Sequence, residues 1–189
     1  ITMKRFFDLL FSFMALAVLL LPFIFFAFLI KFTSDGPILH WSDRVGRKNK
    51  IFKMPKFRSM YDHTPPDKAT HLLQEPEIYV TKIGKLLRLT SLDETPQFIC
   101  VIKGEMSLVG PRPALFNQKD LIKLRQFHGV DNLVPGITGW AQINGRDQLS
   151  IKEKVKLDIE YKKNQTIFLD IKILWFTIFS INKKNKISH

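Results

Sequence analysis

The chain has 189 residues, with 29 Lys and Arg against 17 Asp and Glu, a formal net charge of +12. A single cysteine, Cys100, excludes an intramolecular disulfide framework and argues against a secreted, disulfide-stabilised domain. The positive charge leaves three classes of partner open: nucleic acid, an anionic membrane surface and phosphorylated substrates.

The first predicted element is a membrane helix. Residues 9–30 are apolar except for Ser12 and Pro22, which is long enough to cross a bilayer and too long for the core of a signal peptide. We therefore divide the chain into a membrane helix, residues 1–32, and a domain, residues 33–189.

The topology of this helix stays open on composition alone. Lys4 and Arg5 precede the apolar run, and a larger basic cluster follows it between residues 31 and 50. Positive charge marks the cytoplasmic side, so the domain is expected in the cytoplasm. Pro22 favours a kink. Both a kinked spanning helix and a re-entrant helix with both ends on the cytoplasmic face fit this pattern.

The remaining elements follow from turn signals and periodicity. After a turn at residues 35–37 we expect a strand, then a hairpin over residues 43–60 with Gly46 and Asn49 in its turn, and a polar loop at 61–79. Residues 80–90 predict a basic amphipathic helix that could lie along lipid headgroups. Ser91 and Glu94 have capping-box spacing, which predicts a helix over 91–104 that ends at Gly104.

The second half is predicted to be mainly helical. We expect a strand that runs into a proline-fixed turn at 106–113, helices at 115–127 and 150–164, a structured loop at 134–147, and an apolar helix at 166–181 that is buried or lies against lipid. Ser150 and Glu153 again have capping-box spacing. The predicted fold class is α+β, mostly helical, with a few short strands.

The most informative chemical cluster is Asp93-Glu94. At a helix start these carboxylates either stabilise the helix and do nothing more, or act beside a bound phosphate as a nucleophile or as Mg²⁺ ligands. Lys56, Arg88 and Arg112 are candidate phosphate ligands, and Arg112 is restricted by its flanking prolines. Asp170 lies within the apolar C-terminal segment, where a carboxylate usually has an Arg, Lys or metal partner.

Four motifs occur in order after the apolar segment: KFRSM, LRLTSLDETPQ, KGEMSLVGPRP and PGITGWAQINGR. With them the chain resembles the bacterial sugar transferase family, the small monotopic phosphoglycosyl transferases that begin glycoconjugate assembly. The resemblance extends over nearly the whole chain, and by size it is strongest to the single-domain members. It implies transfer of a phospho-sugar from a UDP-sugar to polyprenyl (undecaprenyl) phosphate, which yields a polyprenyl diphosphate sugar and UMP.

The resemblance also implies roles for single residues. Asp93 would attack the β-phosphate to form a phosphosugar-aspartyl intermediate in a ping-pong reaction, with Glu94 assisting metal binding or proton transfer and Mg²⁺ held by both. Phosphate and substrate binding would fall to Lys56, Arg88, Arg112, Arg146 and Asp170.

The family's first segment is a re-entrant helix broken near a proline, commonly after serine. Here the pair is Leu21-Pro22. The resemblance implies membrane lipids as partners and a place in the bacterial inner membrane, with the catalytic domain on the cytoplasmic face. It is compatible with a membrane-resident homodimer. The sugar and the glycan pathway are left open.

Two other classes of function compete with this one. A membrane-tethered nucleic-acid binder would use the +12 charge, but the sequence has no helix-turn-helix or RNA-binding signature, so we expect no nucleic-acid partner. A structural membrane adaptor without catalysis would not depend on Asp93.

Overall fold

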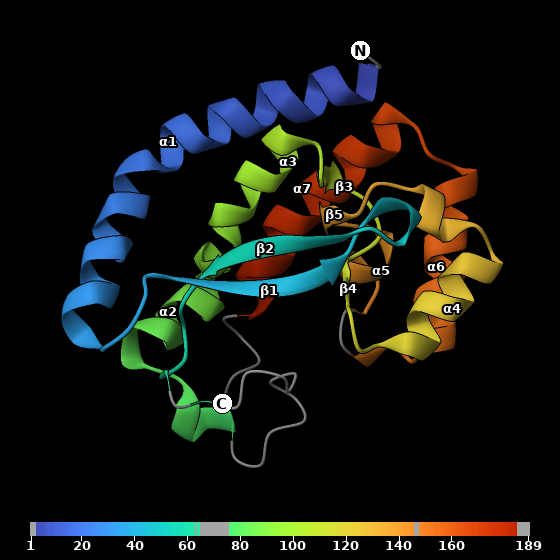
Figure 1. The fold of residues 1–189 in the computed structure, drawn as a ribbon. Helices are drawn as coiled ribbons and strands as arrows, with labels where there is room; N and C mark the ends of the chain where they lie inside the picture. The colour runs from blue at the N-terminus through green and yellow to red at the C-terminus, as the bar shows by residue number, and fades with distance from the viewer. Residues whose placement is uncertain (1–2, 63, 65–75, 146–147, 185–189) are drawn as a thin grey trace.

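The computed structural model describes residues 3–62, 64, 76–145 and 148–184, which are mostly helical with two small sheets (Figure 1). The α-helices are α1 (Met3–Thr33), α2 (Lys82–Thr90), α3 (Phe98–Lys103), α4 (Lys119–Phe127), α5 (Trp140–Ile143), α6 (Ile151–Lys163) and α7 (Ile167–Lys184). The 3-10 helices are η1 (Arg47–Asn49), η3 (Pro76–Tyr79), η4 (Leu92–Gln97) and η5 (Val130–Asn132). The strands are β1 (Leu39–Val45), β2 (Ile51–Phe57), β3 (Ser107–Val109), β4 (Ala114–Leu115) and β5 (Gly136–Thr138). The predicted fold class, α+β and mostly helical, is confirmed.

The larger sheet has the order β2-β1-β4. β1 and β2 form the predicted antiparallel hairpin, in a register that places His40 opposite Lys56 and Arg44 opposite Phe52. The turn between them contains Lys48 and Asn49 with positive φ angles of 53° and 60°. The short β4 pairs with the other edge of β1 near Arg44, so the segment that follows the GPRP motif, residues 110–113, is joined to the hairpin.

The second sheet is the parallel pair β3 and β5. The segment from Gly136 to Gly139 lies directly against Gly110. A Cβ on Gly136 would lie 2.1 Å from the Gly110 nitrogen, and one on Gly139 would lie 2.1 Å from the Gly110 oxygen. Glycine is therefore required there for close packing. The region that we predicted as a structured loop contains a short strand and a short helix, β5 and α5, besides irregular backbone.

The predicted helix over 91–104 is correct only at its end. Gly104 follows α3 with a φ of 86°, but residues 92–97 form the 3-10 helix η4. Ser91 adopts a left-handed conformation with a φ of 57°, terminates α2, and makes no side-chain cap. The capping-box prediction at Ser91 is wrong because the Glu94 side chain binds two cations instead. The capping box of Ser150 and Glu153 is confirmed at the start of α6.

The main core lies between the hairpin and helices α3 and α7, as Figure 1 shows. Its fully or nearly fully buried members are Phe52, Met54, Cys100, Val101, Met106, Leu108, Val109, Tyr161 and Ile173. The core fixes β2 against α3, and η4 lies on the chain between α2 and α3.

Helix α1 continues across Pro22 and bends along its length (Figure 1). Among the described residues it is the one helix long and apolar enough to cross a membrane. Most of its side chains are exposed, whereas Asp8, Ser12 and Ile30 are buried against the domain. The helix therefore touches the domain near both of its ends and presents an apolar surface between them.

The start of α1 is attached by polar contacts. The Arg5 guanidinium donates to the carbonyl oxygens of Val101 and Ile102, at 2.5 and 2.7 Å. The Asp8 carboxylate accepts hydrogen bonds from the Ser107 hydroxyl and the Leu108 amide, each at 3.0 Å. These bonds fix the first turns of α1 to the end of α3 and to β3.

The far end of α1 is attached by apolar packing and by Arg58. Ile30 packs with Phe57 and Leu87 in a second buried cluster. The Arg58 guanidinium donates to the carbonyl oxygens of Ser34 and Asp35, just beyond the helix. Arg58 is 5 % exposed, so this attachment is part of the domain's interior.

Candidate active site

Glu94 on η4 lies at the centre of a small cluster of charged side chains. Its Oε1 atom accepts hydrogen bonds from the Lys56 ammonium at 2.7 Å and from the Arg112 guanidinium at 2.9 Å. Burial alone would raise the pKa of Glu94, but the charges and hydrogen bonds of Arg112 and Lys56 outweigh it and hold this pKa well below its usual range. Glu94 is therefore ionised at neutral pH.

The pKa of the neighbouring Asp93 is shifted in the opposite direction. Burial raises the pKa of Asp93, and the negative charge of Glu94 adds to this effect, while Lys56, Arg88 and Arg112 oppose it. Within the described part of the chain, no residue donates a hydrogen bond to the Asp93 carboxylate. A partly desolvated carboxylate without hydrogen-bond donors, surrounded by cations, is suited to nucleophilic attack on an anionic substrate.

Four cations from four segments surround this pair. Lys56 comes from β2, Arg88 from α2, Arg112 from the GPRP turn and Arg44 from β1. Arg88 donates from Nε to the Ser59 hydroxyl at 2.8 Å, and burial lowers its pKa while the charge of Asp93 raises it. The three predicted cations Lys56, Arg88 and Arg112 are therefore brought together around the predicted pair.

Arg44 was not predicted as a site residue, because the sequence pattern grouped it with the basic residues 31–50 that follow the membrane helix. Burial, and then the charge of Arg112, lower the pKa of Arg44 to about 10, and Glu94 partly compensates. Its guanidinium donates to the Pro113 carbonyl at 3.3 Å. The pairing register of the hairpin is the signal that could have indicated Arg44 as a site residue, because residues 40, 44 and 56 lie on one face of the paired strands.

Asp170 is located at a different contact. Its Oδ2 atom forms an ion pair with the Lys4 ammonium at 2.5 Å, and its Oδ1 atom accepts from the Tyr161 hydroxyl at 2.7 Å. Lys4 also donates to the Val109 carbonyl at 3.1 Å, while burial and then the Asp170 charge raise the pKa of Tyr161. The predicted partner of Asp170 is thus a lysine at the start of α1, and the structure does not bring Asp170 to Glu94. Arg146 lies outside the described residues.

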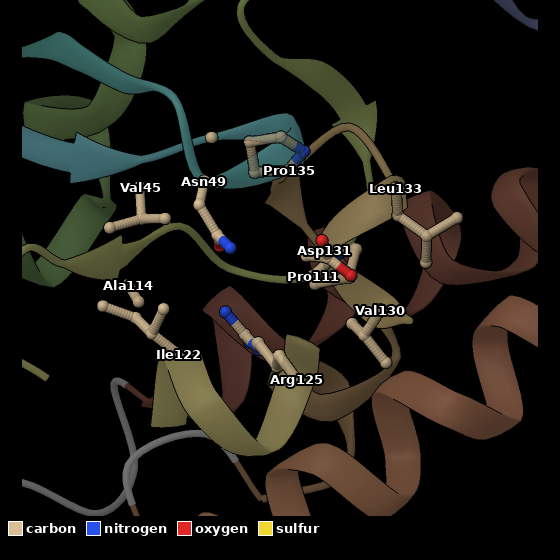
Figure 2. A pocket seen from close by; sticks show the side chains of 11 residues that line it. Val45, Asn49, Pro111, Ala114, Ile122, Arg125, Val130, Asp131, Leu133 and Pro135 are labelled. Carbon is tan, nitrogen blue, oxygen red and sulfur yellow. The ribbon is translucent and has the colours of Figure 1, made fainter. Parts of the chain in front are cut away.

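The cavity in Figure 2 is separate from this cluster. It lies behind the GPRP turn, among the β1–β2 turn, α4 and η5. Its lining residues are Val45, Gly46, Asn49, Pro111, Ala114, Ile122, Arg125, Val130, Asp131, Leu133 and Pro135.

A metal ion at the site would need ligands from the substrate. In the described ranges no group of three or more His, Cys, Asp or Glu side chains could hold a metal. Mg²⁺ is commonly held by one or two carboxylates together with substrate phosphates. Asp93, whose oxygens receive no hydrogen bond from the described residues, and Glu94, whose hydrogen bonds with those residues both use Oε1, match that donor set.

These features define a class: an enzyme with a carboxylate pair in a cationic setting, attached to a membrane helix and suited to phosphorylated substrates. Comparison with known proteins gives the family. Residues 1–184 match the bacterial sugar transferase family, and the chain belongs to it. The family and the enzyme class predicted from the four motifs are confirmed.

Several relatives are similar to this chain over most of its length. It is 39 % identical to the uncharacterized sugar transferase EpsL of Bacillus subtilis over 176 residues, which cover 93 % of this chain and 85 % of EpsL. It is 40 % identical to the undecaprenyl-phosphate glucose phosphotransferase of Komagataeibacter xylinus, over 93 % of this chain and 35 % of that protein. It is 42 % identical to the UDP-glucose:undecaprenyl-phosphate glucose-1-phosphate transferase of Escherichia coli, over 83 % of this chain and 36 % of that protein. The chain thus spans about a third of the length of the latter two relatives.

Proposed function

We propose that this chain transfers a sugar 1-phosphate from a UDP-sugar to polyprenyl (undecaprenyl) phosphate, releasing UMP. The observation that carries the proposal is the Asp93-Glu94 pair, with Glu94 bound by Lys56 and Arg112 and with Asp93 free of hydrogen-bond donors in the described chain. The names of the relatives from K. xylinus and E. coli describe this kind of transfer to undecaprenyl phosphate.

The proposed reaction has two displacement steps. A carboxylate oxygen of Asp93 attacks the β-phosphorus of the UDP-sugar, the bond from that phosphorus to the bridging oxygen breaks, and UMP leaves with the bonding electrons. A phosphate oxygen of the polyprenyl phosphate then attacks the same phosphorus and displaces the Asp93 carboxylate. This ping-pong sequence restores the enzyme after each turnover.

The surrounding residues have distinct proposed roles. Arg88, Arg112 and Lys56 bind phosphate oxygens and stabilise the charge that develops in each displacement. Glu94 fixes Lys56 and Arg112 in place through its ion pairs. Arg44, behind Arg112, adds positive charge to the same region. We keep Arg146 as a nucleotide-sugar ligand and propose that Asp170 acts from a distance, by anchoring Lys4.

Mg²⁺ is the proposed cofactor, held by Asp93 and Glu94 together with substrate phosphates. When bound, it would supply positive charge that neutralises the diphosphate and eases departure of UMP. The protein's own cations would serve the same purpose at the phosphate oxygens. Removal of divalent cations with a chelator should therefore reduce UMP release strongly, and added Mg²⁺ should restore it.

The membrane part of the proposal rests on the attachment of α1. Arg5 binds the domain at one end of α1, and Arg58 of the domain binds the carbonyl oxygens of Ser34 and Asp35 just beyond the other end, which supports a re-entrant helix with both ends on one face of the bilayer. Positive charge at both ends supports the cytoplasmic face of the bacterial inner membrane. The division at residues 32 and 33 separates this helix from an interfacial catalytic domain, which meets a lipid substrate and a soluble anionic donor.

UMP release from a panel of UDP-sugars is the experiment that tests the function. Purified chain, Mg²⁺ and undecaprenyl phosphate are combined with each donor in turn, beside Asp93→Asn and Glu94→Gln. We expect release with one or more donors, none above background with Asp93→Asn, and a strong reduction with Glu94→Gln. Turnover near the native rate in the Asp93 variant would contradict the nucleophile assignment, and the panel would identify the sugar.

A further inference from the structure

The GPRP turn has few backbone hydrogen-bond donors of its own. Pro111 and Pro113 have no N–H group, so two of the three residues at its centre offer only carbonyl oxygens. Each of the three carbonyls is instead held by a donor from a distant segment. Pro111 accepts from the Gly136 amide at 3.0 Å, Arg112 from the Arg125 guanidinium at 2.7 Å, and Pro113 from Arg44 at 3.3 Å.

Arg125 is the donor that holds the central residue of this turn. It lies on α4, and its Nη1 atom donates to the Arg112 carbonyl. Its Nε and Nη2 atoms bind one oxygen of Asp158 on α6, at 2.9 and 2.8 Å. The side chains of Arg125 and Asp158 are 12 % and 2 % exposed, so this ion pair is rigidly placed in the interior.

Pro111, Ala114 and Arg125 line one small cavity beside the turn. Figure 2 shows the cavity behind the turn, with Pro111 and Ala114 on its wall and Arg125 pointing into it from α4. The cavity is small, about 30 Å³. On this side of the turn the Arg112 carbonyl is held by the hydrogen bond from Arg125 at 2.7 Å.

We infer that Arg125, fixed by Asp158, is a positioning residue that places Arg112 against Glu94 and the reacting phosphate. The carbonyl of Arg112 binds Arg125 and its guanidinium binds Glu94 at 2.9 Å, so one residue joins the buried α4–α6 ion pair to the active site. A shift of about 1 Å in a group that positions substrate costs about 100-fold in rate. This inference rests on the proposed function and extends it to two helices that hold no predicted site residue.

The test is a double-mutant cycle on UMP release. Arg125→Met should lower kcat by about 10- to 100-fold, and Arg125→Lys should lower it less, because one ammonium can reach either Asp158 or the Arg112 carbonyl. In an Arg112→Lys background the same Arg125→Met change should have little further effect. Losses that multiply in the double variant would overturn the inference, since two independent contributions combine in that way.

A matched control separates positioning from general damage to the helices. Lys162 on α6 donates to the His128 carbonyl at the end of α4, at 3.0 Å, and so joins the same two helices without touching the GPRP turn. Lys162→Met should leave kcat unchanged. An equal loss of kcat in Lys162→Met and Arg125→Met would show that any weakening of the α4–α6 contact has this effect, and the inference would be wrong.

A readout without turnover distinguishes failure of this inference from failure of the proposed function. Hydrogen–deuterium exchange should rise in the peptide over residues 107–118 in Arg125→Met and Asp158→Asn, relative to Lys162→Met. If the native chain releases no UMP with any donor, the proposed function fails, and exchange alone then decides on the positioning role. Unchanged exchange in this peptide would overturn it.

Discussion

Asp93 and Glu94 are neighbours with oppositely shifted pKa values. Burial raises the pKa of Asp93, whereas Arg112 and Lys56 overcome burial and lower that of Glu94. Two titratable groups whose environments separate their pKa values are typical of sites in which each has its own role. Here the ion-paired Glu94 organises cations, and Asp93, which forms no ion pair with the described residues, is kept in a less stable, more reactive ionised form.

This contrast predicts opposite effects of two isosteric substitutions on stability. A raised pKa means that folding favours the neutral form of Asp93, so its contribution to the free energy of unfolding is lost as pH rises through that raised value. Asp93→Asn should therefore raise the Tm at pH 7. The lowered pKa of Glu94 means that its contribution is present above its ordinary value and lost only at lower pH. Glu94→Gln should lower the Tm, because it should reduce the free energy of unfolding by about 1–3 kcal/mol. Thermal unfolding of both variants in one detergent checks this, and shifts of the same sign would contradict it.

The acid limb of the pH–rate profile should report Asp93. As the nucleophile it must be ionised, so kcat/KM should fall on the acid side at a pH above the ordinary aspartate value of about 3.9. Glu94→Gln removes a negative neighbour that raises the pKa of Asp93, so the limb should move to lower pH in the residual activity of this variant. A limb that moves to higher pH would show that another group controls it.

At the residue scale, the carboxylate pair and three cations of the candidate site were named from the sequence, while their roles came from the family resemblance and stay predictions. A carboxylate pair before a helix and an arginine between two prolines are informative without coordinates. Arg44 could not be found in this way, because its role depends on strand register, and the partner of Asp170 depends on a contact between the two ends of the chain.

At the scale of elements, α1 and η4 show where local patterns were sufficient and where they failed. Length and apolar content predicted α1, and the capping box of Ser150 and Glu153 predicted the start of α6. The same spacing failed at Ser91, because Glu94 gains more from the two cations of Lys56 and Arg112 than from a cap. Local preference gives way where a functional site draws the side chain elsewhere.

Cysteine labelling tests whether both ends of α1 lie on the same side of the membrane. Met3 and Phe32 are 75 % and 72 % exposed at opposite ends of the helix, and the native Cys100 is buried. Met3→Cys and Phe32→Cys in a Cys100→Ala background should both react with a membrane-impermeant maleimide from the cytoplasmic side only. The Cys100→Ala chain alone gives the background. Reaction of Met3→Cys from outside would mean that the helix spans.

At the scale of the whole molecule, large apolar surfaces are exposed on α1 and α7. On α7 the exposed side chains include Phe168, Trp175 and Ile178, at 87 %, 61 % and 62 %. A soluble monomer rarely exposes contiguous apolar surface of this extent, and such patches mark contact with a membrane or a partner. We predicted that the C-terminal helix is either buried or against lipid. In the structure one face is in the core at Ile173 and another face is exposed.

Fluorescence quenching tests whether α7 lies in the bilayer surface. A chain with Trp175 as its one tryptophan, made by Trp41→Phe and Trp140→Phe, should be quenched by brominated lipids after reconstitution. A chain with Trp140 alone is the control, because that side chain packs against the core and should be quenched much less. Equal quenching of the two chains would contradict an interfacial α7.

The contact between Lys4 and Asp170 also has a consequence for biosynthesis. The two residues are 166 positions apart, so this contact at the start of α1 forms only after α7 has been made. Until then the start of α1 can be held by the contacts of Arg5 and Asp8 with residues 101–108 but not by this ion pair. We therefore expect the N-terminal end of α1 to be more accessible to protease in a nascent chain that ends before Asp170 than in one that extends through α7.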